Sequence, residues 1–452
     1  MLKAIHTNIL HFFTRGHQRS VKAKMNVLQS VLLKVVSVGI SMVLIPLTIN
    51  YVNATQFGVW LTLSSIITWA LMFDMGLGNG LKNKLTQAIT LGNYEQARSY
   101  VSSTYAMLIA IAAALFVVIY TVNPFINWAA ILNVGANDAD WNKLVLLVFC
   151  FFCVQFVAQL INTVLTANQA PAKVAMLNVI GQVFTLVAIL MLMRIYPGSL
   201  VALVVVMGGI PLLVSLIASF WYYKGEFHYI APSFKLANKT YAREMLGAGG
   251  LFFFLQINAL VLYETDNIVI TQIFGPQEVT TFNVVYKLFS VVLMFFVVII
   301  TPFWSACTEA FIKDDYAWIK RALAKINKLW LALCVCSVAL LVISPWVYKI
   351  WLKQAVTIPF ALSLSMCIQM ITLIWQAIHV QLLNGIGKIK LQFYVGIVGS
   401  LANIPLSIFL GKSIGIAGVP LSNTIIFIVM GIVFSIQTRK IINKTATGIF
   451  NA

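Results

Sequence analysis

Long apolar stretches alternate with short polar segments along the whole chain. A helix needs about 20 apolar residues to cross the hydrocarbon core of a bilayer. Windows of this kind occur near residues 26–49, 58–81, 100–122, 144–166, 174–194, 200–223, 246–270, 279–302, 327–348, 358–383, 391–410 and 416–437. The pattern predicts an all-α integral membrane protein with twelve transmembrane helices.

Composition supports the same class and disfavours metal chemistry. Hydrophobic residues make up 61% of the chain and charged residues 9%, against about 45–50% and about 25% in soluble domains. The cysteines inside apolar runs are expected to behave as small hydrophobic residues rather than as disulfide partners or zinc ligands: Cys150, Cys153, Cys334, Cys336 and Cys367. We expect no metal and no cofactor.

The basic residues are distributed unevenly between the two sides of the predicted membrane. The chain has 30 Lys and Arg against 12 Asp and Glu. Of the 30, two lie deep within predicted spans (Lys34 and Lys287), and only Lys143, Arg194, Lys349, Lys353 and Lys412 lie in outer segments or at the outer end of a span. The other 23 lie in inner segments or at the inner end of a span if the N-terminus is cytoplasmic. Cytoplasmic loops are rich in Lys and Arg, so both termini are expected inside, and the charge indicates lipid headgroups rather than nucleic acid.

The spans and loops divide the chain into five predicted segments. These are a basic cytoplasmic segment (1–25), a six-helix bundle (26–223), a cytoplasmic linker (224–245), a second six-helix bundle (246–437) and a cytoplasmic tail (438–452). The longest outer loop covers roughly residues 123–142. Because a membrane glycosyltransferase or polymerase is expected to carry catalytic groups on a large outer loop, the chain is predicted not to be an enzyme.

An internal repeat supports two halves. Residues 86–98, "TQAITLGNYEQAR", align without gaps on 308–320, "TEAFIKDDYAWIK", at an offset of 222. At the same offset "YVNATQFGVW" aligns with "IFGPQEVTTF", and Gly80 meets Pro302. Each pair falls at the same place in a six-helix unit. Two halves of this kind form a substrate site at their interface in many transporters.

The glycine run in "FDMGLGNGL", residues 73–81, is predicted to be structural. A phosphate-binding loop lies between a strand and a helix, whereas this run follows a long apolar helix window. We expect the glycines to end the second spanning helix, and residues 81–98 to continue as an interfacial helix whose counterpart follows Pro302.

Four stretches resemble Wzx-type polysaccharide flippases of the multidrug/oligosaccharidyl-lipid/polysaccharide exporter superfamily. They are "YVNATQFGVW", "FDMGLGNGL", "ETDNIVITQIFGPQEVTTFNVVYKL" and "NIPLSIFLGKSIGIAGVPLSNTI". The resemblance implies two pseudo-symmetric six-helix bundles around a central cavity, a MATE-like fold. It also implies export of an undecaprenyl-pyrophosphate-linked oligosaccharide, typically an O-antigen repeat unit, across the bacterial inner membrane. It leaves open which coupling ion takes part, H⁺ or Na⁺, and whether a polymerase and a ligase are partners.

Polar residues recur at helical spacing inside several windows. Gln159 and Gln376, and Asn162 and His379, coincide in the two halves at an offset of 217. Similar stripes contain Ser30, Ser37 and Ser41; Gln155 and Thr166; Asn178, Gln182 and Thr185; Asn283 and Ser290; Thr372; and Ser400, Asn403 and Ser407. The stripes fit either hydrogen bonds between helices or a hydrated cavity that binds sugar hydroxyls.

Charged residues within the apolar windows add candidates for substrate binding. A charge at the bilayer centre costs roughly 2.5–3.5 kcal/mol on insertion scales, so Lys34 and Lys287 are expected to contact an anionic substrate or to pair with Asp74 or Asp266. The candidate substrate-binding residues are Lys34, Lys287, Asp74, Gln159, Asn162, Gln376, His379, Asp266 and Glu264.

Several function classes fit these features to different degrees. A cation-coupled multidrug antiporter would need a cavity rich in carboxylates and aromatics, whereas the mid-span charges here are lysines, which suit an anion. The sequence therefore favours a flippase that moves a lipid-linked oligosaccharide by alternating access. The antiporter and a peptidoglycan-precursor flippase remain the alternatives, because one fold carries several substrates.

Overall fold

The computed structural model describes residues 18–71, 77–135, 140–168, 170–196, 198–241, 244, 261–262, 264–352 and 356–451. These residues form α-helices, short 3₁₀ turns and connecting loops, with no strand among them, which confirms the all-helical class. Ten helices in the described part are long and apolar enough to span a membrane. The chain is a multi-pass membrane protein. The windows 58–81 and 246–270 lie partly outside the described residues, so the count of twelve spans stays a prediction.

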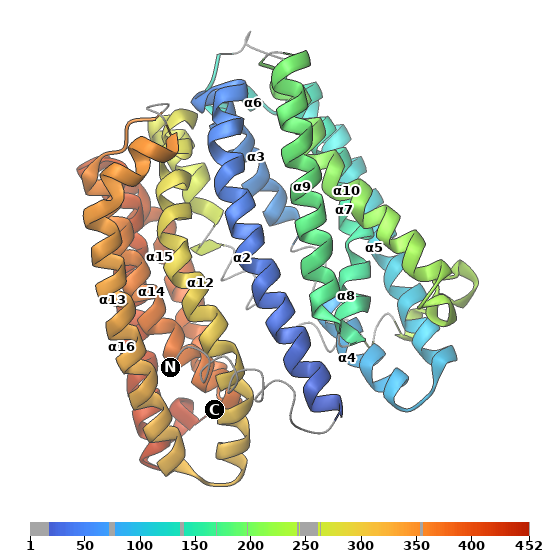
Figure 1. Cartoon of the computed structure of the whole chain (residues 1–452), viewed down its shortest axis with the longest axis vertical. Helices are drawn as coiled ribbons and strands as arrows, with labels where there is room; N and C mark the ends of the chain where they lie inside the picture. Colours follow the sequence, from blue (N-terminus) through green and yellow to red (C-terminus); the bar gives the residue numbers. More distant parts are fainter. Residues whose placement is uncertain are drawn as a thin grey trace, which may run out of the picture. The chain divides into compact units, whose positions relative to one another are not determined.

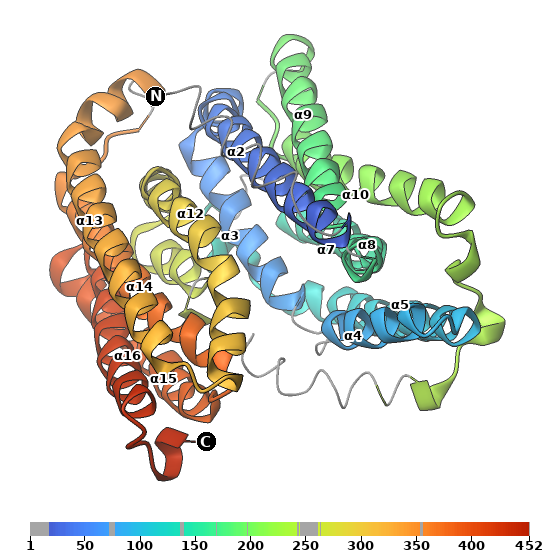
Figure 2. The same cartoon turned by 60° about the horizontal axis from the view of Figure 1, so that its bottom comes forward.

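The helices fall into two compact units, which are described separately. The first unit contains α2 (Gln18–Val52), α4 (Leu77–Thr90), α5 (Tyr94–Val122), α7 (Trp141–Ala158), α8 (Leu160–Ala167), α9 (Pro171–Ile195) and α10 (Leu200–Lys224). In it α7 packs against α5 and α10, α9 packs against α10, and α4 packs against α5 and α8 (Figure 2). Asp140 caps α7, and its hydrogen bond from Lys143 lowers the pKa of this carboxyl.

The second unit contains most of the C-terminal half together with two earlier helices. Its elements are α3 (Ala54–Leu71), α6 (Trp128–Leu132), the helical residues 264–274, α12 (Pro276–Ile312), α13 (Tyr316–Leu352), α14 (Phe360–Ile386), α15 (Lys390–Ile414) and α16 (Gly418–Ile442). Helix α14 packs against α12, α13 and α16, and α15 packs against α16 (Figure 1). The two six-helix bundles predicted at 26–223 and 246–437 remain a prediction.

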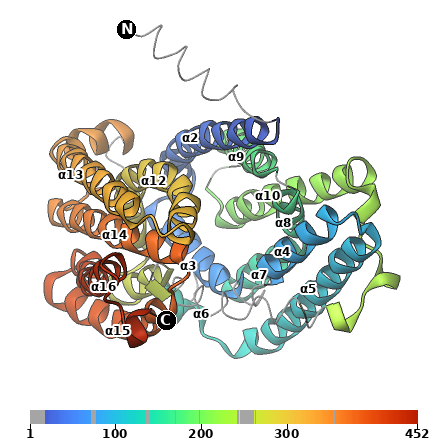
Figure 3. The ribbon, with the colours of Figure 1, turned by 90° about the horizontal axis from the view of Figure 1, so that it is seen from below.

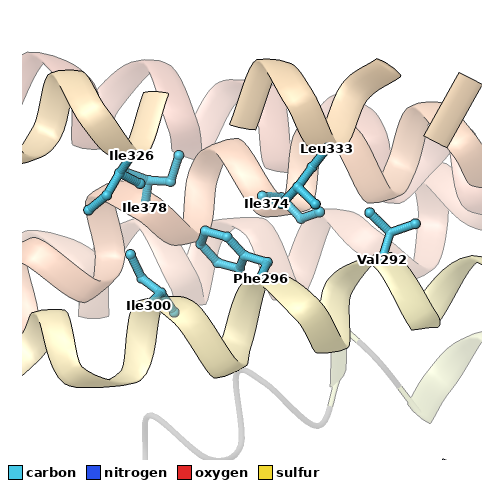
Figure 4. Packing of buried hydrophobic residues seen from close by; sticks show 7 residues of the cluster. All are labelled: Val292, Phe296, Ile300, Ile326, Leu333, Ile374 and Ile378. Carbon is cyan, nitrogen blue, oxygen red and sulfur yellow. The ribbon is translucent and has the colours of Figure 1, made fainter. Parts of the chain in front are cut away.

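Apolar residues at helical spacing hold α12, α13 and α14 together. The cluster consists of Val292, Phe296 and Ile300 from α12, Ile326 and Leu333 from α13, and Ile374 and Ile378 from α14 (Figure 4). The members on one helix lie four or seven residues apart, so they share a face. Lipid tails are as apolar as these side chains, so close van der Waals packing stabilises the contact.

A close backbone contact joins α3 to the start of α12. A Cβ on Gly58 would lie 1.6 Å from the carbonyl oxygen of Pro276. The hydroxyl of Thr280 donates to the carbonyl of Ala54 at 2.6 Å. Gly58 and Thr280 are 222 residues apart, as are Ala54 and Pro276. The two equivalent helix starts therefore contact each other in a nearly symmetric way.

Two predictions about the inner segments are wrong. Helix α4 contains Gly78 and Gly80 in its first turn and ends at Thr90, and α5 starts at Tyr94 after a tight turn. Residues 81–98 are therefore not one interfacial helix. Helix α12 runs through Pro302 to Ile312. A proline removes one backbone hydrogen bond, which a membrane helix tolerates when neighbouring groups satisfy the freed carbonyl.

Four 3₁₀ turns complete the described elements. They are η2 (Asn123–Phe125), η3 (His228–Ile230), η4 (Phe234–Leu236) and η5 (Gly448–Asn451). Besides α12 with Pro302, helices α2, α10, α13 and α15 each contain an internal proline, namely Pro46, Pro211, Pro345 and Pro405.

Candidate functional site

A buried carboxylate lies among amide side chains in the second unit. Asp266 is 3% exposed, and its Oδ2 accepts a hydrogen bond of 2.6 Å from Nδ2 of Asn423 on α16. Oδ1 of Asn423 accepts in turn from Nδ2 of Asn403 on α15, also at 2.6 Å. These three residues, the Asp266 chain, connect residues 264–274 to the last two helices.

Two oxygens of the Asp266 chain lack a partner among the described residues. They are Oδ1 of Asp266 and Oδ1 of Asn403, and both atoms are buried. Asn403 is fully buried. A buried carboxylate is costly unless it is neutralised by a proton or a cation, or satisfied by several donors. A proton or a small cation would meet this need, and oxygen atoms are the ligands that hard cations prefer.

A second polar chain runs beside the first and reaches α3 and α12. Asn267, the neighbour of Asp266, accepts from Nδ2 of Asn283 at 2.7 Å and donates to the hydroxyl of Ser65 at 2.8 Å. The half-buried carboxyl of Glu264 faces the same Ser65 hydroxyl. The two chains bring Glu264 and Asp266 together with polar groups from four helices.

Lys287 lies one helical turn after Asn283 on α12 and is half-buried. Its carbonyl accepts from the hydroxyl of Ser290. Lys34 lies on α2 in the first unit and is exposed. Asp74 lies outside the described residues, so its pairing with either lysine stays a prediction.

The paired candidates on the fourth and tenth predicted spans lie in different local structures. Gln159 sits at the junction where α7 ends and α8 begins, and Asn162 lies in the first turn of α8; both are half-buried. Gln376 and His379 lie in the interior of α14, 7% and 6% exposed. A break in the helix thus occurs in the first half at the position where α14 continues.

Several polar stripes serve helix packing. Nδ1 of His379 lies 3.3 Å from the hydroxyl of Thr438 on α16. The imidazole ring of His379 also packs edge-on against the ring of Trp375. Gln155 donates to Ser215 of α10 at 3.2 Å. Other members bond to their own helix, namely Ser41, Thr166, Thr185, Ser290 and Thr372. Hydrogen bonds between helices account for part of the pattern, and the hydrated cavity stays a prediction.

The sequence does not predict most members of the two polar chains. Asn403 and Asn283 belong to predicted polar stripes, whereas Asn423, which bonds Asp266, and Asn267 and Ser65 of the second chain do not. A polar side chain within an apolar window is a signal for such residues. The spacing along one helix does not say which distant helix it will meet.

Comparisons of the sequence with known proteins find a family and several relatives. Residues 23–305 match the family model described as "Polysaccharide biosynthesis protein". The chain is 21% identical over 367 residues to a protein of Yersinia pseudotuberculosis described as an O-antigen export protein, covering 79% of this chain and 82% of the relative. It is 21% identical over 390 residues to a protein of Salmonella typhimurium described as an O-antigen transporter, covering 82% and 86%.

Solved structures of membrane transporters share the arrangement of helices. An inward-facing multidrug resistance MATE family transporter of the MOP superfamily superposes with a TM-score of 0.73 at 12% identity, covering 92% of this chain and 95% of that one. A MOP superfamily transporter from Pyrococcus furiosus superposes with a TM-score of 0.65 at 13% identity, covering 94% and 97%. The predicted MATE-like fold is confirmed.

Proposed function

The chain belongs to the polysaccharide biosynthesis protein family, and we propose that it is a flippase for a lipid-linked oligosaccharide. The observation that carries the proposal is the similarity to two relatives described for O-antigen export or transport, over about four-fifths of this chain. The substrate would be an undecaprenyl-pyrophosphate-linked O-antigen repeat unit, moved from the inner to the outer leaflet. On this proposal the chain is a transporter and not an enzyme.

The proposed orientation places both termini in the cytoplasm and the protein in the bacterial inner membrane. It rests on the excess of Lys and Arg in the predicted inner segments. Reporter fusions at residues 135 and 235 should lie on opposite sides of the membrane. If both report the same side, the helix count between them is wrong; if residue 235 reports the outer side, the proposed orientation is wrong.

The proposed transport step is alternating access between two six-helix halves. Lys34 and Lys287 would attract the pyrophosphate, while Gln159, Asn162, Gln376 and His379 would bind sugar hydroxyls. Lysine suits this role because its ammonium group is a flexible, hydrated point charge that can release the headgroup again. Asp74 remains a candidate pairing partner for these lysines. The polyprenyl tail would stay in the lipid.

The Asp266 chain is proposed as the site of the coupling ion, a proton or Na⁺. The support is the buried carboxylate oxygen that has no donor among the described residues, next to a chain of amides. One bound monovalent cation would neutralise one carboxylate in a medium of low dielectric constant. Glu264, two residues before Asp266, is a second carboxyl beside this site.

Deletion of the gene in a host with known surface glycans tests the substrate. We expect loss of the surface polysaccharide and accumulation of its lipid-linked repeat unit in the inner leaflet, both reversed by the plasmid-borne chain. Accumulation of the peptidoglycan precursor would assign the alternative substrate. Increased drug sensitivity with unchanged lipid-linked intermediates would assign the antiporter.

A further inference from the structure

The segment after α10 is fixed to the side of α5 in the first unit. Nε of Arg98 donates to the carbonyl of Ala231 at 2.8 Å. The hydroxyl of Ser102 accepts from the backbone N–H of Ser233 at 3.0 Å, and that of Ser103 accepts from the N–H of Asn238 at 2.9 Å. Residues 231–239, called the docked linker below, run beside α5 (Figure 3).

The attachment points set the height of the docked linker relative to the membrane. Ser102 and Ser103 are buried and lie in the first turn of the predicted span 100–122 on α5, so they mark its inner end. At the same end of the unit, Trp221 on α10 is 74% exposed and is followed one turn later by Lys224. Tryptophan followed by lysine is typical of the membrane–water interface. The docked linker therefore lies at the level of the lipid headgroups.

The docked linker exposes an aromatic side chain between lysines. Phe234, in η4, is 77% exposed. Lys235 and Lys239 are exposed as well. The two serine bonds, to Ser233 and Asn238, lie on either side of η4 and hold its backbone in place. A fixed and exposed Phe beside two lysines suits the membrane interface, where apolar acyl chains lie beneath negatively charged headgroups.

We propose that the docked linker binds acidic phospholipid in the cytoplasmic leaflet. Phe234 inserts below the headgroups, and Lys235 and Lys239 contact the lipid phosphates. The serine bonds bind this anchor to α5, so it belongs to the first unit. The inference rests on the orientation proposed above, but not on the identity of the transported substrate.

Site-directed fluorescence on the full-length protein tests the insertion of Phe234. Phe234→Cys, in a background without the native cysteines, is labelled with bimane and placed in nanodiscs of phosphatidylcholine with phosphatidylglycerol. We expect blue-shifted emission that is quenched by spin-labelled lipid, while the matched label at Thr240→Cys, also exposed, emits as in water. Equal emission and equal quenching at the two sites would overturn the proposal.

A second measurement keeps the native Phe234 and tests the lysines. Phosphatidylglycerol titrated into the purified protein should bind roughly fivefold more weakly for each of Lys235→Gln and Lys239→Gln, and salt should reduce the difference. Lys143→Gln, at an exposed lysine of the first unit on the opposite side of the proposed membrane, is the control and should bind like wild type. Unchanged affinity in both linker variants would contradict the proposal. Neither measurement uses the oligosaccharide, so failure here is distinct from failure of the proposed function.

Discussion

Asn93 and Asp315, 222 residues apart, occupy the same position in two turns with the same hydrogen bonds. The backbone N–H of Asn93 donates to the carbonyl oxygen of Ala88, and the N–H of Asp315 donates to the carbonyl oxygen of Ala310, both at 2.9 Å. The residue before each is left-handed, with φ of 73° at Gly92 and 56° at Asp314. The internal repeat inferred from sparse identities is therefore present in the backbone.

A second pair of turns repeats at the same offset. Asn53, with φ of 103°, precedes α3, and Gly275, with φ of 92°, precedes α12. Two turns at one offset, each at the same place in its half, agree with the duplication of a common unit.

Loss of either cap should destabilise the helix that follows. The side chains of Asn93 and Asp315 accept from the N–H groups of Gln96 and Trp318. Asn93→Ala and Asp315→Ala should each lower the free energy of unfolding by about 1 kcal/mol, measured by thermal unfolding in detergent. Gln87→Ala, at an exposed position of α4, should change it little. If only one of the two variants loses stability, the two turns are not energetically equivalent.

The turn between α4 and α5 shows which part of the fold the sequence could predict. The apolar windows located ten spans, because a run of about 20 apolar residues is needed to cross a bilayer. The sequence also paired Tyr94 with Tyr316. The predicted helix over residues 81–98 includes Gly92 and so misses the turn, although glycine adopts the left-handed conformation found there without steric cost.

The site was less predictable than the spans. A charge within an apolar window requires compensation, so the sequence indicates Asp266 as a candidate, with an ion pair to Lys34 or Lys287 as one alternative. The structure shows a further partner, Asn423, 157 residues away. The packing of residues 264–274 on α16 decides this pairing, and no local pattern of either segment encodes it.

Gly58 should tolerate no side chain. A Cβ would lie 1.6 Å from the carbonyl oxygen of Pro276, so Gly58→Ala must separate α3 from α12. We expect little folded protein by size-exclusion chromatography in detergent. The control is Gly39→Ala on α2, where nothing lies within 4 Å, and where alanine should stabilise the helix by about 0.5–1 kcal/mol. Normal yield of Gly58→Ala would mean that this contact is looser than the structure indicates.

Removing the Asp266 charge should remove ion-dependent stability. A ligand at one hundred times its Kd stabilises the folded state by about 2.7 kcal/mol, so wild type should unfold at a higher temperature in Na⁺ than in choline. Asp266→Asn should lose this difference, whereas Glu95→Gln, at an exposed carboxylate, should keep it. An unfolding temperature that depends on pH but not on Na⁺, and loses this dependence in Asp266→Asn, would identify the proton as the coupling ion. If Asp266→Asn keeps the wild-type response to both ions, the Asp266 chain is not the coupling site.

The paired polar positions should face water if the halves enclose a cavity. Single cysteines at Gln159, Asn162, Gln376 and His379, in a background without the native cysteines, should react with a small water-soluble thiol reagent. The buried positions on α14 should react in a transporting cycle more than in a detergent-locked state, since alternating access exposes them in turn. Cysteine at Thr438, which contacts His379, is the packed control. Four inert sites beside a reactive loop cysteine would favour the packing interpretation.

The two lysines within the spans should be needed for transport and not for folding. Lys34 is exposed on α2 and Lys287 is half-buried on α12, so truncation of either leaves no large buried cavity. If they attract pyrophosphate, Lys34→Ala and Lys287→Ala should each lower surface glycan about ten- to hundredfold, the loss expected for a hydrogen bond to a charged group, at matched membrane levels. Arginine should rescue incompletely, because its fork holds phosphate more rigidly than a lysine does. Lys412→Ala, at an exposed lysine near the end of α15, controls for loss of charge. Wild-type glycan in both alanine variants at low expression would refute the pyrophosphate role and leave the two lysines as structural residues.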